Sequence, residues 1–338
     1  MKFWRKFLAD IKEAKYFAVI LDSTPDKAHR DQFSFLIRYC LEGKVYEKFI
    51  TFLQVSNHTG KSIAEEVFLF MQKHDIDVEL CRRQSYDNTS NMSRIYQGLQ
   101  TQICKKSCLA LFCPCSAHSL NLVGAHAIEC CSDAISFFNL IQQLYTFFVA
   151  STHQWNLLLS NLLPTEKNQI IVLKSLSTTR WSRHAESCKS VIVNYEQILN
   201  ILLQILEDSN EKADSRKEAL SLRSKMVTFE TAFMLTLWHD ILNAMNKVSI
   251  YFQKPGLDLF TTVNLLKGLN VSIASFRDQF YKFKERSQLL SPHVMTSSKD
   301  QEKRLRRKKF TMVLSNPKQL AMQLFKNLKN LKLKLYLW

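Results

Sequence analysis

The chain has little glycine and proline, with six of each among its 338 residues. This scarcity argues against a linker-rich or low-complexity protein. It also argues against a glycine-lined nucleotide site, and neither G-x-x-x-x-G-K-[ST] nor G-x-G-x-x-G occurs. No apolar run reaches the roughly 18–20 residues that cross a bilayer. The basic N-terminus is not followed by a signal-peptide core, so we expect neither a membrane protein nor a secreted one.

The hydrophobic fraction of 46% is ample for a packed core. Nine cysteines, an odd number, are scattered through the chain, which favours reduced thiols in an intracellular protein over a disulfide framework. A length of 338 residues suits two domains, or one domain with a large insertion.

Positive charge is concentrated at the C-terminal end. The net charge is +16, and the segment from Lys299 to Trp338 holds twelve Lys or Arg but two acids. A basic run in this segment predicts nuclear import or phosphate contact, although a solvated, disordered tail has the same composition. We expect a nuclear protein, or otherwise a cytoplasmic one, for which nucleic acid is one possible partner and the protein partners are unknown. The run consists of Lys303, Arg304, Arg306, Arg307, Lys308 and Lys309.

The strongest strand signal is the apolar run over 16–22, which ends on Asp22 and is typical of a central, covered strand. Period-2 alternation over 33–39 and 45–53 predicts two more strands in an antiparallel meander. In the third strand we expect Val45, Glu47, Phe49, Thr51 and Leu53 on one side.

Helical and strand patterns then alternate up to about residue 130. Asp87, like Asp22, comes just after a strand. The order β-β-β-α-β-α-β-α, with carboxylates near two strand ends, is that of a ribonuclease-H-like nuclease core, where acids converge on paired divalent metals. The expected helices are 1–15, 61–74, 92–105 and one opened by 113–118; the expected strands are 78–84 and 109–112. Beyond these, helices are expected over 133–163, 181–208, 212–226, 228–254 and 258–286.

Each candidate residue also has a structural explanation. Asp22 can be a turn former, and Asp87 an Asx-turn or helix N-cap residue. Cys115 and His118 form a C-x-x-H at a helix start, which is half of a zinc site, but a structural zinc needs four ligands. The same pair is a poor nucleophilic dyad, because no orienting third group is evident.

Four motifs follow one another along the chain. They are Ile20-Leu21-Asp22-Ser23-Thr24-Pro25-Asp26, the segment Gln84–Ser93, Cys115-x-x-His118-x-x-Asn121-Leu122, and Thr179-Arg180-Trp181. Together they resemble the transposases of the hAT superfamily, and among them the host-encoded zinc finger MYM-type relatives. The resemblance covers about residues 1–290.

This resemblance implies a ribonuclease-H-like core interrupted by a helical insertion, and strand transfer by a D-D-E triad with Mg²⁺. Asp22 and Asp87 match the two aspartates, both as catalytic residues and as metal ligands. Cys115 and His118 match the C-x-x-H pair beside the active site. Arg180 and Trp181 match the R-W motif, with either a DNA-binding or a packing role.

The chain departs from the family pattern. We find no segment matching the one that carries the family's glutamate, and none matching its dimerisation region or its N-terminal zinc finger. We therefore expect a truncated chain whose two remaining acids are vestigial.

The sequence thus predicts an α+β fold: a partial ribonuclease-H-like mixed sheet over 1–132, an all-α insertion over 133–290 and a basic, disordered tail over 291–338. The expected function is that of a transposase-derived fragment without catalysis that still binds nucleic acid or protein. The alternatives are an active Mg²⁺-dependent nuclease that recruits a third acid, such as Glu186 or Glu230, and a pseudogene product.

Overall fold

The computed structural model describes residues 2–25, 31–55, 57, 59–87, 92, 98–129, 131–164, 168–177, 181–254 and 256–292. The chain divides into two compact units between Ser119 and Leu120. None of the helices in the described ranges combines the length and apolar character that a bilayer crossing requires. The basic run at 303–309 and Arg180 lie outside these ranges.

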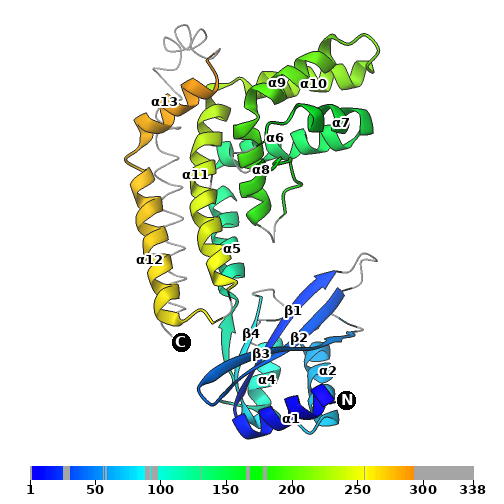
Figure 1. Ribbon diagram of the computed structural model, residues 1–338, viewed down its shortest axis with the longest axis vertical. Helices are drawn as coiled ribbons and strands as arrows, with labels where there is room; N and C mark the ends of the chain where they lie inside the picture. Colours follow the sequence, from blue (N-terminus) through cyan, green and yellow to red (C-terminus); the bar gives the residue numbers. More distant parts are fainter. Residues whose placement is uncertain are drawn as a thin grey trace. The chain divides into compact units, whose positions relative to one another are not determined.

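The strands of the first unit form one mixed sheet in the order β3-β2-β1-β4-β5 (Figure 1). The first three are antiparallel neighbours, whereas β4 runs parallel to both β1 and β5. This is the predicted α+β sheet, with the apolar run at its centre. The strands are β1 (Phe17–Pro25), β2 (Asp31–Leu41), β3 (Lys44–Leu53), β4 (Cys81–Tyr86) and β5 (Leu111–Pro114).

One face of this sheet carries the core of the first unit. Phe17, Val19 and Leu21 of β1 are buried there with apolar residues from three helices. On the other face Phe49 and Phe52 of β3 remain about half exposed. The helices are α1 (Lys2–Ala14), α2 (Gly60–Lys73) and α4 (Leu99–Lys106).

The expected facing of β3 is wrong in its second half. Val45 and Glu47 lie opposite Cys40 and Arg38, but the register shifts between Phe35 and Leu36. After this bulge Thr51 and Leu53 pair with core-facing residues of β2, and Leu53 is buried. One extra residue in a strand moves every later side chain to the opposite face, which strict alternation does not predict.

Two more strand boundaries differ from the expected ones. The stretch predicted as strand 78–84 begins with a 3₁₀ turn, η1 (Val78–Leu80), and the strand starts only at Cys81. The Asp77 carboxylate accepts a hydrogen bond from Glu79 N at 2.9 Å, so it caps the turn. The strand predicted at 109–112 lies two residues later, because Ala110 N bonds to Ser107 O in a turn at 3.1 Å.

The second unit is helical, as predicted, but three of its expected long helices are each broken in two. One break occurs at Asn194, whose fully buried side chain accepts a hydrogen bond from Leu163 N at 2.7 Å and donates one to Ser190 O at 3.0 Å. A short break of this kind does not disturb the apolar periodicity. The helices are α5 (Ser116–Glu129), which crosses the division, α6 (Ser132–Val149), α7 (Thr152–Asn161), α8 (Trp181–Val193), α9 (Tyr195–Glu207), α10 (Ala213–Met226), α11 (Phe229–Phe252), α12 (Leu259–Phe276) and α13 (Phe280–Leu290).

Trp181 anchors α8 in the core of this unit. Its ring is buried, stacks on His184 with 4.7 Å between ring centroids, and covers Gly124 of α5. A Cβ atom at residue 124 would lie 2.8 Å from the Trp181 ring, closer than carbon atoms can pack. A glycine at this position therefore allows α5 and α8 to meet.

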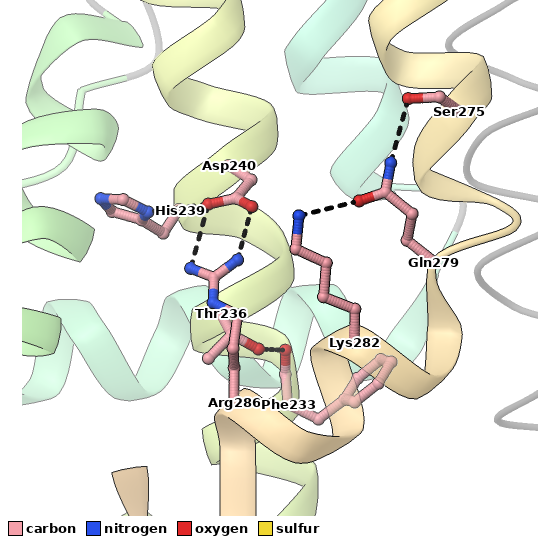
Figure 2. A network of polar contacts seen from close by, with 8 residues as sticks. All are labelled: Phe233, Thr236, His239, Asp240, Ser275, Gln279, Lys282 and Arg286. Atoms are coloured by element: carbon pink, nitrogen blue, oxygen red, sulfur yellow. Dashed lines mark hydrogen bonds and ion pairs between the residues drawn. The ribbon is translucent and has the colours of Figure 1, made fainter. Parts of the chain in front are cut away.

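Figure 2 shows a polar network that ties α11 to α13. Arg286 of α13 donates to both carboxylate oxygens of Asp240 in α11, at 2.6 and 3.2 Å, and His239 approaches the same carboxylate at 3.0 Å. Burial raises the pKa of Asp240, but the hydrogen bonds of His239 and Arg286 and the charge of Arg286 outweigh it and lower the pKa to about 2.

The Gly124 contact predicts opposite effects of one substitution at two helical glycines. Gly124→Ala should lower the free energy of unfolding by about 1–3 kcal/mol, because the new methyl group overlaps the Trp181 ring. Gly268→Ala in α12 is the matched control: no atom lies within 4 Å of the place that its new methyl group would take, so the better helix propensity of alanine should raise stability by about 0.5–1 kcal/mol. Urea unfolding of the two variants measures both effects, and a stable Gly124→Ala variant would contradict the close contact.

The Asp240 network predicts an acid-dependent loss of stability. A folded-state pKa of about 2 against an ordinary 3.8 stabilises the fold above pH 3.8, and this contribution is lost as the pH falls towards 2. At pH 6 Asp240→Asn should therefore cost about 2 kcal/mol of unfolding free energy, and the difference from the wild type should shrink between pH 4 and pH 2. Asp278→Asn, in the exposed turn before α13, serves as control. A difference that does not depend on pH would contradict the assigned ion pair.

Candidate active site at the ends of three strands

The parallel pairing of β1 with β4 brings the two predicted acids together. The last paired residues are Ile20 and Ser85, and Asp22 and Asp87 each follow two residues later. The register therefore places Asp22 beside Asp87, on the same face and on strands about 4.8 Å apart. On the other side of β1, the Ser34 hydroxyl donates to Asp22 O at 3.0 Å, and β1 continues beside β2 for three residues beyond Asp22, to Pro25.

Cys115 lies next to Asp22 and Asp87, and we call these three residues the acidic row. Cys113 pairs with Ser85 in the parallel register of β4 and β5, and Cys115 N donates to Tyr86 O at 3.1 Å, so the pairing continues past the strands. Burial raises the pKa of the Cys115 thiol, hydrogen bonds from the His118 and Ala117 backbone lower it, and the charges of Asp22 and Asp87 raise it again. Both carboxylates thus act on one thiol, in agreement with the register.

The Cys115 thiol also occupies the N-cap position of α5. It accepts from the backbone N–H groups of Ala117 and His118, while Ser119 N bonds to Cys115 O at 2.9 Å. A helix N-terminus carries partial positive charge. The two carboxylates of the row therefore have an electropositive helix end on one side, and such an end favours the binding of anions.

Behind this row, a buried amide holds the end of β4. Gln84 is fully buried; its Nε2 donates to Ala110 O at 2.7 Å and Gln100 O at 3.3 Å, and its Oε1 accepts from the Tyr86 hydroxyl at 2.7 Å. Burial raises the pKa of Tyr86, so the phenol stays protonated and donates. The network joins β4 to α4 and to the segment that leads into β5.

Sequence reasoning missed Gln84 as a positioning residue. Its signal is present in the alternation of β4, where Gln84 occupies a core-facing position between Cys81 and Tyr86. A polar side chain at such a position requires partners, because a buried unpaired amide is costly.

The remaining predicted residues do not all join the row. His118 follows on α5 and reaches Cys115 through its backbone. Trp181 lies in the core of the helical unit, where it packs on Gly124, and this burial favours the packing alternative for it. Among the residues that the structure describes, no group of three or more His, Cys, Asp or Glu side chains is arranged to hold a metal ion, so the zinc alternative gains no ligand set.

Parts of the chain are similar to known proteins. Residues 3–98, which hold both acids, match the family model described as "ZMYM1/FAM200, RNase-like domain". The chain is also 24% identical over 201 residues to the human "52 kDa repressor of the inhibitor of the protein kinase", an alignment that covers 59% of this chain. The chain spans about a quarter of the length of that relative, since the match covers 25% of it. The predicted resemblance to transposase-derived, ZMYM/FAM200-like proteins and the RNase-like sheet are confirmed.

The row predicts that the two acids suppress the reactivity of Cys115. Replacing both by Asp22→Asn and Asp87→Asn removes two charges that raise the thiol pKa, so more thiolate forms at a given pH. Iodoacetamide should then alkylate Cys115 roughly two- to fivefold faster than in the wild type. Peptide mapping by mass spectrometry measures the rate. Glu65→Gln, an exposed acid on α2, is the control, and an unchanged rate in the double variant would place the acids away from the thiol.

Proposed function

We propose that this transposase-derived, ZMYM/FAM200-like chain binds nucleic acid at the edge of the sheet that carries Asp22 and Asp87, and that these residues alone do not cleave it. The observation that carries the proposal is the strand register, which puts the two carboxylates side by side at the N-terminus of α5. Two acids beside a helix N-terminus suit a phosphate held through a cation.

The donor set fits one magnesium ion shared with a phosphate. Mg²⁺ is usually bound by one or two carboxylates together with substrate phosphates and water. Asp22 and Asp87 would supply the carboxylates. The third place in the row is occupied by the Cys115 thiol, a soft ligand that suits magnesium poorly. When bound, the ion would neutralise the two acids and attract the nucleic-acid backbone.

Within the described part of the chain the row consists of two acids and one thiol, and this argues for binding without cleavage. Two-metal chemistry stabilises both the attacking and the leaving oxygen, which requires more than a pair of acids. The alternative function is a nuclease that recruits a third acid from the helical unit. Of its two candidates, Glu186 is already engaged in an ion pair with Lys174.

We place this binding in the nucleus, on the strength of the basic run at 303–309. A fluorescent fusion with this run replaced by alanine tests the location: it should lose nuclear enrichment. The hAT-type relationship of the motifs belongs to the same proposal.

If the proposed site is correct, the effect of removing both acids on DNA binding should depend on whether Mg²⁺ is present. With Mg²⁺ present, Asp22→Asn together with Asp87→Asn should weaken binding of single-stranded and duplex DNA by roughly three- to tenfold, because the shared cation is lost. With EDTA, the same change should leave binding equal or tighter, because it removes two charges that repel phosphate. Fluorescence anisotropy at fixed salt measures both.

Two outcomes would contradict the proposal. If the double substitution changed binding equally in both buffers, no cation would be bound at the site. Magnesium-dependent nicking that Asp22→Ala abolishes would overturn the inactive assignment in favour of the nuclease. Glu65→Gln should change neither binding nor nicking.

A further inference from the structure

A small pocket lies at the opposite ends of β1 and β4 from the two acids. It encloses about 220 Å³ between α1, the start of β1 and the segment 75–80. The floor is apolar and the rim is charged. Leu8, Ile11, Phe17, Ile76 and Leu80 form the floor, and Lys12, Lys15, Asp75 and Asp77 the rim.

Three side chains next to this pocket form a cationic cluster. The Arg82 guanidinium lies over the Tyr16 ring, 4.2 Å from its centroid, and the Lys15 ammonium lies 5.4 Å from the same centroid. Tyr16 is 45% exposed, so the cluster faces solvent. A hydrogen bond from Arg82 and the charge of Lys15 lower the pKa of Tyr16, as expected for a phenol beside two cations.

Backbone contacts hold this cluster in place. Arg82 Nη1 donates to Glu79 O at 2.7 Å and to Cys81 O at 3.2 Å, on either side of Leu80 in the pocket floor. Lys15 has a left-handed φ of 64° at the end of α1, and Tyr16 N bonds to Ala14 O at 2.7 Å. The cluster and the pocket are therefore parts of one surface, and Lys15 belongs to both.

We propose that this surface binds an acidic peptide segment that inserts one apolar side chain into the pocket and places a neighbouring carboxylate on Lys15 and Arg82. The pocket volume accommodates one leucine or phenylalanine side chain against an apolar floor. Alternate residues of an extended peptide face the same side and lie roughly 6.6 Å apart, so an acid two positions from the apolar residue reaches the adjoining cations. Charge-assisted hydrogen bonds to a guanidinium and an ammonium recognise the carboxylate.

The charge pattern favours a peptide over nucleic acid at this place. Three acids, Asp75, Asp77 and Glu79, stand around the same surface, and one of them, Asp75, forms an ion pair with Lys12. A phosphate backbone would run past these acids, whereas a peptide presents its carboxylate locally and can donate backbone N–H groups to them. The apolar floor further requires an anchor that buries hydrocarbon.

The test uses the full chain and the peptide acetyl-Asp-Glu-Leu-Phe-amide as probe. We expect shifts of the Ile11 and Ile76 methyl resonances in NMR titration, with a dissociation constant of about 1 mM or tighter. The methyl group of Ile63, a buried residue of α2, should not respond. Acetyl-Asn-Gln-Leu-Phe-amide and acetyl-Asp-Glu-Gly-Ser-amide should each bind several times more weakly, since one lacks the charge and the other the anchor.

Lys15→Asn should weaken binding of the probe roughly threefold, because it removes one ammonium while suiting the left-handed backbone. Lys44→Asn, an exposed lysine at the start of β3, is the matched control and should bind as the wild type does. Equal binding of the peptide without an anchor, or no methyl shift at all, would overturn the proposal. The same shifts with a short oligothymidylate, weakened by salt, would overturn it in favour of nucleic acid.

Discussion

The hydrogen bonds of one buried amide underlie the arrangement of the first unit. Gln84 sits in the middle of β4 with no exposure to water, and its amide satisfies carbonyl groups of Gln100 and Ala110 as well as the Tyr86 hydroxyl. Truncating it would leave these groups unpaired, which costs about 1–3 kcal/mol for each buried polar group. Because the partners come from α4 and from the approach to β5, the amide specifies where β4 lies relative to both.

The acidic row depends on a second constraint, the parallel pairing of β4 with β1. Once β4 is fixed beside β1 in parallel register, Asp22 and Asp87 must come level with each other, and Cys115 arrives next to them when β5 pairs with β4. No contact between the two carboxylates is needed to hold them. Their mutual repulsion is instead tolerated because the backbone is held by the sheet and because the N-terminus of α5 faces the row.

The sequence predicted the parts of this unit that rest on local pattern. The apolar run of β1, the alternation of β2 and the apolar stripe of α2 all form where expected, because burial on one face determines each of them. The errors fall where one residue changes the pattern: the bulge that turns Thr51 and Leu53 inward, and the buried Asn194 that ends α8. Each depends on a partner distant in sequence, which periodicity does not contain.

The candidate site was predictable in its acids but not in its third member. Asp22 and Asp87 stand directly after strand patterns, and a parallel sheet brings such positions to one edge. Cys115 could be noticed through its C-x-x-H spacing, yet that spacing suggests a partnership with His118. The structure instead uses the thiol as a helix cap in line with the carboxylates. Cys115 lies beside the two acids because of the strand register, and the register depends on contacts between segments that are distant in sequence.

The two ends of β1 and β4 present different charged groups, and the strand register and the entering segments determine which. Towards their C-terminal ends the strands carry Asp22, inside β1, and Asp87, just after β4, which come level because the strands are parallel. At the N-terminal ends the chain enters β1 through the left-handed Lys15 and enters β4 through Arg82, which is tied to the backbone around Leu80. The first edge thus carries two acids, and the second carries the cations Lys15 and Arg82 together with acids of the segment 75–79. An anion bound directly by cations belongs at the second edge, whereas an anion bound through a metal ion belongs at the first, so the two proposed ligands need not compete.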